Sequence, residues 1–312
     1  MNAVHSPRPE RLGVEGAGLD GRPDGEPAGT DAYLPQRPYP TLPRQRLPAG
    51  ACDSHFHVFE DAYPCAEPRS YTPAPAPMDS YRAVMSALGV DRAVLIQPSV
   101  YGRDHRLFES MLAQHGAWMR GVAVVYGDTP DDDIARWDRL GARGARCNAL
   151  YEGGATLEEM RCVIDRVRAF GWHVQLLVDV ARSPRTAIDI ADLNVPVVVD
   201  HFGHLPVEKG VNDPGFANLV SLVREGRAWV KLSAAYRLTN ERRDFSRFQP
   251  MVDALLRADA GRLVWGTDWP HPAMRAPMID DGVLADAVLD WLGPADRQRV
   301  LVDNPTALYW RR

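Results

Sequence analysis

Histidine and aspartate side chains follow three separate apolar runs in the sequence. His55 and His57 come at the end of one run, His201 follows a second, and Asp268 follows a third. A carboxylate beside imidazoles can take a proton from water, and imidazoles can donate hydrogen bonds to an oxyanion or hold a metal ion. If the fold brings these stretches together, their residue types predict hydrolysis of a carbonyl compound.

The spacing of His55-Phe56-His57 indicates that both imidazoles enter one cavity, because residues two apart in a β-strand point to the same face. A His-x-His pair alone is a weak signal and is often structural. The prediction of a site therefore depends on its combination with His201 and Asp268, which follow other candidate strands.

Eight short apolar runs are the candidate strands that would position these side chains. Most of them are continuously apolar rather than alternating, which is typical of parallel strands buried on both faces. The runs are Ala51–Phe56, Arg92–Gln97, Gly121–Tyr126, Gly144–Cys147, His173–Val178, Val195–Asp200, Trp229–Ser233 and Leu263–Gly266.

Amphipathic stretches between these runs predict helices. The clearest is Leu157–Phe170, whose apolar residues form one stripe with a period of about 3.6 residues. The others are Asp79–Leu88, Pro130–Leu140, Pro184–Leu193, Phe216–Val223 and Pro250–Leu256.

Alternation of strands and helices favours an α/β fold of the (β/α)8 TIM-barrel type, whose active sites lie at the carboxyl ends of the strands. An open doubly wound sheet is the alternative. That fold should carry a Gly-rich phosphate turn after its first strand, where this chain has Asp53-Ser-His-Phe-His57.

Residues 1–47 differ from the rest of the chain. They are rich in Pro and Gly and show neither a helical nor a strand period. We therefore expect a flexible or wrapping N-terminal arm over residues 1–47 and one barrel domain over residues 48–312.

Composition narrows the class of protein. The net charge of −5 argues against a nucleic-acid binder. No run approaches the roughly 20 apolar residues of a membrane span, and the N-terminus lacks the apolar core of a signal peptide. We expect a cytoplasmic protein, possible self-association into a homo-oligomer, and free thiols at all four cysteines.

Several stretches are similar to one enzyme family, the amidohydrolase-2 branch of the amidohydrolase superfamily, and within it to the 2-pyrone-4,6-dicarboxylate lactonases. The similarity runs from about Pro48 to Trp310 and implies a barrel that hydrolyses small carbonyl compounds, often lactones. The stretches that carry it are Ala51–Phe59, Gly141–Arg146, Val199–Gly203, Trp265–Pro272 and Asp303–Trp310.

The resemblance also implies catalytic roles. His55, His57 and His201 would line the end of the site that receives the carbonyl group. Asp268 would be the general base that takes a proton from water.

Substrate-binding roles follow from the same resemblance. Arg146 and Arg237 match arginines that hold substrate carboxylates, a task that suits the planar guanidinium fork. The further substrate-binding candidates are Tyr71, Ser99 and His204.

Three positions depart from the lactonase pattern. Glu152 and His204 stand where the lactonases carry arginines, and Leu177 stands where they carry a tyrosine. We therefore expect a substrate with one anionic group rather than the same dicarboxylate.

A metal-free reaction is the favoured expectation, because the resemblance to the lactonases implies a metal-independent enzyme. The only histidine of the fifth candidate strand, His173, begins that strand and is expected to be structural. If a single divalent ion such as zinc is bound, its expected ligands are His55, His57, His201 and Asp268.

Three further residues receive expectations about their position or role. Asp200 precedes His201 and is expected to point out of the barrel. Arg143 is expected to be structural, and His271 either orients Asp268 or caps a turn.

Taken together, the sequence predicts a hydrolase that opens a small carboxylated lactone, as in the breakdown of aromatic compounds. A lactone isomerase or decarboxylase on the same barrel is the alternative. A binding protein without activity has no chemical need for all four of the catalytic candidates.

Overall fold

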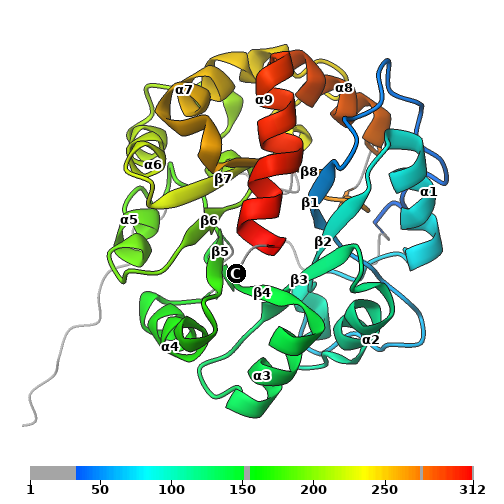
Figure 1. Cartoon of the computed structure of the whole chain (residues 1–312), viewed down its shortest axis with the longest axis vertical. Coiled ribbons are helices and arrows are strands. Elements are labelled where there is room, and N and C mark those ends of the chain that lie inside the picture. Colours follow the sequence, from blue (N-terminus) through cyan, green and yellow to red (C-terminus); the bar gives the residue numbers. More distant parts are fainter. Residues whose placement is uncertain (1–32, 151–154, 275–276, 311–312) are drawn as a thin grey trace, which may run out of the picture.

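Eight parallel strands form the centre of the computed structural model, which describes residues 33–150, 155–274 and 277–310 (Figure 1). They pair in sequence order, and every predicted run overlaps one of them. The strands are β1 (Cys52–Phe56), β2 (Arg92–Ile96), β3 (Met119–Val124), β4 (Ala142–Asn148), β5 (His173–Leu177), β6 (Val197–Val199), β7 (Ala228–Ser233) and β8 (Leu263–Gly266).

The first and last strands meet and close the sheet into a barrel. Phe56 and Trp269 form a parallel bridge. The backbone N–H of His57 donates to the carbonyl of Trp269 at 2.8 Å, and that of Asp268 donates to the carbonyl of His55 at 2.8 Å. The protein is therefore a (β/α)8 TIM barrel, as predicted, and closure brings the ends of β1 and β8 together.

Helices surround the barrel and bury their apolar faces against it (Figure 1). The six predicted helices are confirmed, while α2, α8 and α9 were not predicted. The helices are α1 (Met78–Leu88), α2 (Arg106–His115), α3 (Asp131–Leu140), α4 (Leu157–Val167), α5 (Thr186–Ala191), α6 (Pro214–Arg224), α7 (Gln249–Asp259), α8 (Asp281–Trp291) and α9 (Pro294–Gln298).

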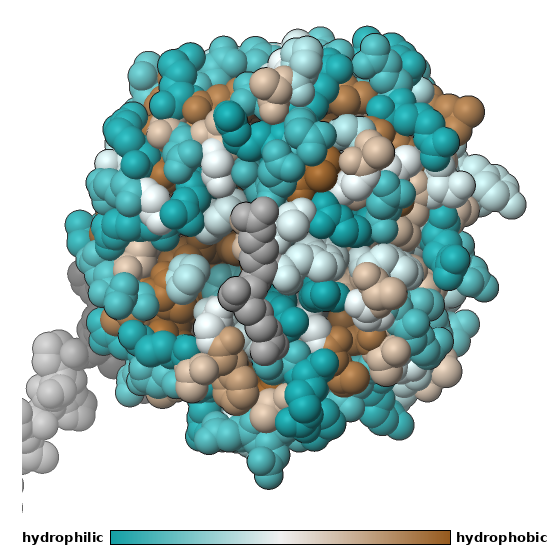
Figure 2. Space-filling model, in the orientation of Figure 1, coloured by the Kyte–Doolittle hydropathy of each residue, from teal (hydrophilic) through white to brown (hydrophobic). Residues whose placement is uncertain are grey.

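The C-terminal segment covers the amino end of the barrel. It continues from α9 through two π-helical turns, Arg299–Asp303 and Thr306–Trp310, and lies across the strands in Figure 1. Tyr309 packs in a cluster with Cys52 at the start of β1. Figure 2 shows the outer surface of this end, which is mostly hydrophilic with scattered hydrophobic residues.

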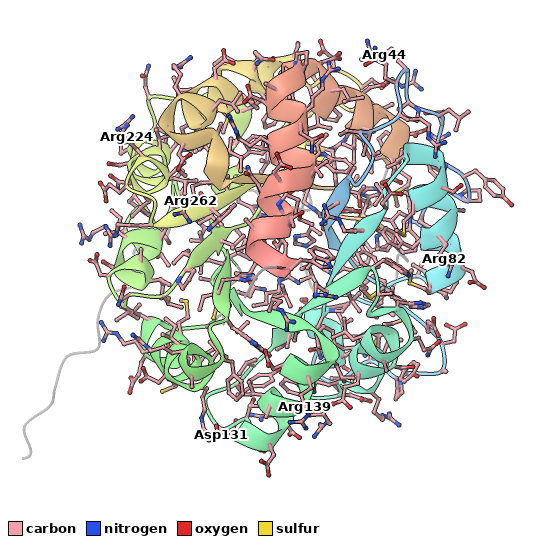
Figure 3. All side chains as sticks on the ribbon, viewed as in Figure 1. Arg44, Arg82, Asp131, Arg139, Arg224 and Arg262 are labelled. Carbon is pink, nitrogen blue, oxygen red and sulfur yellow. The ribbon has the colours of Figure 1, made fainter. Side chains whose placement is uncertain are left out.

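Residues 33–47, here called the strap, lie against α8 and the loop after β8. The backbone N–H of Leu34 donates to the carbonyl of Met274 at 2.9 Å. Arg44, labelled at the edge of the molecule in Figure 3, donates its backbone N–H to Asp286 of α8 at 2.8 Å. The division into an arm over residues 1–47 and a barrel over 48–312 stays a prediction.

None of the helices in the described ranges is long and apolar enough to cross a membrane.

Candidate active site

The four catalytic candidates meet at the carboxyl ends of three strands. His55 lies in β1 with His57 directly after it, His201 follows β6, and Asp268 follows β8. All four side chains are buried. The Nε2 atoms of the three histidines lie 3.6, 3.5 and 3.9 Å, in chain order, from one atom, Oδ1 of Asp268. Closure of the barrel thus gathers residues that are far apart in the sequence.

Hydrogen bonds at the other ring nitrogens determine which atoms face Asp268. Nδ1 of His57 lies 2.7 Å from the carbonyl oxygen of Ile96. Because a carbonyl only accepts, this nitrogen carries the proton. Nε2 of neutral His57 then points its lone pair toward Oδ1 of Asp268, 3.5 Å away. Two electron-rich atoms in this arrangement are stabilised by a proton or a cation between them.

Burial sets the charges in this cluster. It lowers the pKa of His55 to about 3, lowers the pKa of His57, and lowers that of His201 well below its usual value. Burial alone would raise the pKa of Asp268, but Arg237 and the imidazoles hold it well below its usual range. At neutral pH the cluster therefore holds a carboxylate anion among neutral imidazoles.

The two oxygens of Asp268 have different surroundings. Oδ2 accepts a hydrogen bond from the Tyr236 hydroxyl at 2.6 Å and another from Nε of Arg237 at 2.9 Å. Nη2 of Arg237 donates to the carbonyl of Pro272 at 2.9 Å. Oδ1 is therefore the oxygen that faces the imidazoles, while Tyr236 and Arg237 hold Oδ2.

A buried lysine lies beneath the imidazoles. Lys231 of β7 donates from Nζ to the backbone carbonyl of Ser54 at 2.9 Å and to Oε1 of Gln175 at 2.7 Å. Its Nζ lies 3.4 Å from Oδ1 of Asp200 and 3.3 Å from Nδ1 of His55. Burial lowers the pKa of Lys231 to about 8, so the lysine still carries its charge near neutral pH and balances Asp200.

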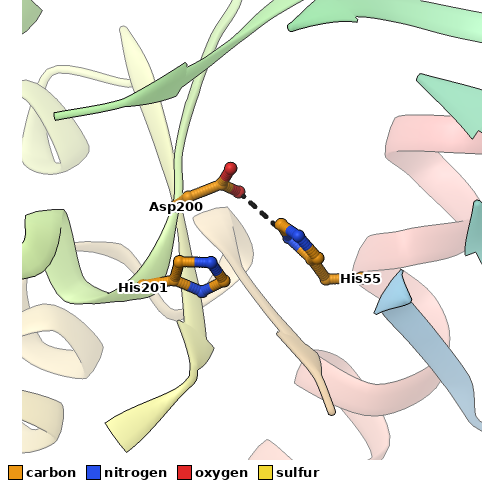
Figure 4. A group of neighbouring side chains, drawn as sticks. All are labelled: His55, Asp200 and His201. Atoms are coloured by element: carbon orange, nitrogen blue, oxygen red, sulfur yellow. Dashed lines mark ion pairs between the residues drawn. The ribbon is translucent and has the colours of Figure 1, made fainter. Parts of the chain in front are cut away.

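The expectation that Asp200 points out of the barrel is wrong. Oδ1 of Asp200 lies 3.3 Å from Nδ1 of His55 (Figure 4). Regular strand alternation would turn Asp200 and His201 to opposite faces, but His201 has a left-handed backbone with φ of 53°. The alternation ends there, so both Asp200 and His201 reach His55.

A cavity of about 470 Å³ lies beside the carboxyl ends of β3 and β4. Arg146 lines it, and Nε of Arg146 is buried with no hydrogen-bond partner among the described residues. Together with burial, the charge of Arg146 lowers the pKa of His57. The same cavity is lined by Arg103, which pairs with Asp128 at 2.9 Å. An arginine that lines a cavity and has a buried Nε without a partner among the described residues suits an anionic ligand.

The other predicted substrate-binding residues take different positions. Ser99 is exposed and lines the cavity. Tyr71 is half-buried, and its ring meets Phe59 edge-on with centroids 6.4 Å apart. His204 is buried 5.3 Å from the ring of His201, and neither of its nitrogens has a hydrogen-bond partner among the described residues. Their roles in binding stay predictions.

The residues with structural expectations are placed as follows. His173 packs edge-on against Tyr309 at the amino end of the barrel, away from the cluster. Nη1 of Arg143 donates to the carbonyls of Asp138 and Ala142 at 3.1 and 2.6 Å, as expected of a structural arginine. Glu152 lies outside the described residues.

A family comparison decides the relationship of this chain to known proteins. The model of the family described as Amidohydrolase matches residues 52–311. The chain belongs to this family. The resemblance that the sequence motifs predicted is confirmed.

This amidohydrolase is similar over most of its length to characterised relatives. It is 32% identical over 295 residues to the 2-pyrone-4,6-dicarbaxylate hydrolase of Comamonas testosteroni, covering 90% of this chain and 97% of the relative. It is 29% identical over 279 residues to the D-galactarolactone isomerase of Agrobacterium fabrum, covering 86% and 94%.

The fold of this amidohydrolase also matches a solved structure. The crystal structure of apo Agrobacterium tumefaciens ATU3138 superposes with a TM-score of 0.78 at 27% sequence identity. The match covers 86% of this chain and 99% of that one.

The site of this amidohydrolase contains two groups of possible metal ligands. One is His55, His57 and Asp268, and the other is His55, Asp200 and His201, each with its ligand atoms within 4.8 Å of one another. The lone pair at Nε2 of His57 and the carboxylate of Asp268 form a nitrogen and oxygen donor set that suits zinc. The hydrogen bond from Nδ1 of His57 to the Ile96 carbonyl orients the ring so that Nε2 can bind a metal ion. The donor set therefore fits a divalent cation.

Sequence reasoning missed Lys231, Gln175 and Tyr236. A signal for Lys231 exists, because one lysine interrupts the otherwise apolar run Trp229–Leu232, and lysine is almost never fully buried unless it is paired. No comparable pattern marks Tyr236, whose contact with Asp268 depends on the turn after β7.

Proposed function

We propose that the protein hydrolyses a small lactone that carries a carboxylate, with Asp268 as the general base for the attacking water. The observation that carries this proposal is the asymmetry of the Asp268 carboxylate. Oδ2 accepts hydrogen bonds from Tyr236 and Arg237, while Oδ1 faces three imidazoles. A buried, ionised carboxylate with one oxygen open to the site can accept a proton from water.

The steps of hydrolysis follow from this arrangement. Oδ1 of Asp268 takes a proton as the water oxygen bonds to the lactone carbonyl. The carbonyl oxygen becomes an oxyanion, which hydrogen-bond donors at the site stabilise. One such donor is the ring N–H of His204, which donates to no described residue. The ring C–O bond then breaks, and the proton on Asp268 returns to the departing ring oxygen. The product is a hydroxy acid, one water heavier than the lactone.

Recognition of the carboxylate is assigned to Arg146. Its Nε is buried and without a hydrogen-bond partner among the described residues, and its side chain lines the cavity of about 470 Å³. Arg237 is already bonded to Asp268 and Pro272. One available guanidinium fits a substrate with one anionic group better than a dicarboxylate.

A divalent metal would be held by His55, His57, His201 and Asp268. When bound, such an ion polarises a carbonyl group and lowers the pKa of water. The sequence expectation of a metal-free reaction stays a prediction. The role proposed for Asp268 as proton acceptor is the same with or without the ion.

Isomerisation of a lactone is the second candidate function. It is favoured by the similarity to the D-galactarolactone isomerase, which extends over 86% of this chain. An isomerase would also move protons through a carboxylate, but without consuming water.

A product assay tests the proposal. Purified protein is incubated with pyrone, muconolactone and sugar lactones that carry one carboxylate, and the product mass is measured before and after chelation. We expect a gain of one water. An unchanged mass with a changed structure would mean isomerisation, and loss of carbon dioxide would mean decarboxylation. Absence of turnover across the panel would contradict the proposed function.

A further inference from the structure

A row of buried polar side chains leads away from Oδ2 of Asp268. The Tyr236 hydroxyl lies 2.6 Å from Oδ2 of Asp268 and 3.2 Å from Nδ1 of His271. Nε2 of His271 lies 3.1 Å from Oδ1 of Asp281. All four residues are at most 3% exposed. Four buried polar groups in succession are costly to assemble unless they bond to one another.

We propose that Tyr236, His271 and Asp281 are positioning residues that hold the Asp268 carboxylate with Oδ1 toward the imidazoles. The inference rests on the proposed function, in which Asp268 is the base. His271 and Asp281 touch neither the imidazole cluster nor the cavity. They act through Tyr236.

The direction of the hydrogen bonds supports this role. A carboxylate only accepts and the one Tyr236 proton is directed to Asp268, so both ring nitrogens of His271 donate, Nε2 to Asp281 and Nδ1 to the Tyr236 oxygen. The Tyr236 hydroxyl donates to Oδ2 of Asp268, because a carboxylate oxygen only accepts. The ring of His271 packs edge-on to that of Tyr236, with centroids 5.1 Å apart, and limits where the hydroxyl can lie.

The backbone after β8 gives a reason for such support. Asp268, His271 and Ala273 all have left-handed backbones, with φ of 63°, 61° and 62°. This conformation costs a residue other than glycine about 1–2 kcal/mol of conformational free energy. Such a loop persists only where its surroundings hold it in place. The row of hydrogen-bonded side chains ties two residues of this loop, Asp268 and His271, to the rest of the barrel.

The far end of the row is anchored by the strap. Asp281 is the first residue of α8, and its neighbour Asp280 caps that helix by accepting from the N–H of Gly282 at 2.9 Å. Thr41 of the strap donates to Asp280 from both its backbone N–H and its hydroxyl at 3.0 Å. The carbonyl of Thr41 packs so closely on Gly282 that an added Cβ would lie 2.1 Å away. The α8 terminus that carries Asp281 is therefore fixed from outside.

A double-mutant cycle tests the positioning role. Tyr236→Phe and His271→Phe each keep an aromatic ring and remove the hydrogen-bonding atoms. We expect each to lower kcat by roughly tenfold to a hundredfold with KM changed less than about twofold. Because both act through one path, the double variant should be little worse than Tyr236→Phe alone. The matched control is Tyr309→Phe, which removes a buried hydroxyl at the other end of the barrel and should leave kcat unchanged.

Hydrogen exchange supplies a readout that needs no substrate. Backbone amides of residues 267–274 should exchange faster in Tyr236→Phe and His271→Phe than in the wild type or Tyr309→Phe. Unchanged kcat together with unchanged exchange, or fully additive losses of kcat, would overturn the positioning role. Faster exchange in a protein that turns over no lactone would refute the proposed function and leave the support of the Asp268 loop in place.

Discussion

Two arginines near the site have different partners, which separates their expected roles. Arg237 donates to Oδ2 of Asp268 at 2.9 Å, whereas Nε of Arg146 has no hydrogen-bond partner among the described residues. Arg237 therefore helps to hold the carboxylate of Asp268. Arg146 is the guanidinium that remains available to a ligand.

Replacing each arginine by methionine should separate the two roles. Arg146→Met is expected to raise KM for an anionic lactone by roughly tenfold to a hundredfold, because a charge-assisted hydrogen bond is lost. A matched neutral ester should show little change. Arg237→Met should lower kcat for both substrates, because Asp268 loses a donor. The measurement is steady-state kinetics on the two substrates.

The control for this pair is Arg139→Met, an exposed arginine at the end of α3 that is labelled in Figure 3. It should leave both constants unchanged. Equal effects of Arg146→Met on the anionic and the neutral substrate would contradict carboxylate recognition by Arg146.

The positions of individual residues were predictable where a residue lies at the end of a strand. They were not predictable where the conformation of a turn decides which way the side chain points. His55, His57, His201 and Asp268 follow buried runs, so the barrel had to place them at one end. Asp200 was misplaced because a left-handed residue after β6 cancels strand alternation. The contacts of Arg237 with Asp268 and of His271 with Tyr236 depend on loop conformations that no residue pattern specifies.

At the scale of elements, β5 begins with a histidine enclosed by its neighbours. The ring of His173 packs on Gly144 of β4, where an added Cβ would lie 2.4 Å from Nε2. It also meets Tyr309 of the C-terminal segment with centroids 5.5 Å apart. Burial, with the charge of Lys231, lowers the pKa of His173 to about 3. The folded protein therefore keeps this imidazole neutral in mild acid.

Acid should destabilise the barrel through this residue. The unfolded chain binds a proton at His173 below about pH 6.5, and the folded chain does so only near pH 3, so stability present above pH 6.5 is lost as the pH falls. The loss at pH 5 is about 2 kcal/mol. His173→Gln, neutral at every pH, should reduce the fall in the free energy of unfolding between pH 7.5 and pH 5 by about that amount.

Urea unfolding at the two pH values makes this measurement. The control is His115→Gln, which changes a partly exposed histidine at the end of α2. An acid-induced fall in the His173→Gln variant as large as that of the wild type would contradict the account.

Strands were more predictable than helices, for a physical reason. Strands buried on both faces read as continuous apolar runs, so all eight were found near their observed bounds. Helices were found where the apolar stripe is regular, as in α4, which also carries a capping box formed by Thr156 and Glu159. The apolar residues of α8 are spread around the helix, because both the barrel and the strap cover it, and no single stripe marks it.

At the scale of the whole molecule, the site exists because the barrel closes. His57 and Asp268 lie far apart in the sequence and meet only through the bonds between β1 and the segment after β8. The C-terminal segment covers the amino end of the barrel. The strap holds the start of α8, which carries the far end of the chain of polar groups that leads to Asp268.

The central claim is that Asp268 takes a proton from water during ring opening, and one substitution tests it most directly. The measurement is kcat of Asp268→Asn on a lactone that the wild type opens, with Asp165→Asn as a control at an exposed carboxylate of α4. The account predicts a loss of at least about 100-fold in Asp268→Asn, no loss in the control, and circular dichroism like that of the wild type in both. Wild-type ring opening by folded Asp268→Asn would contradict it.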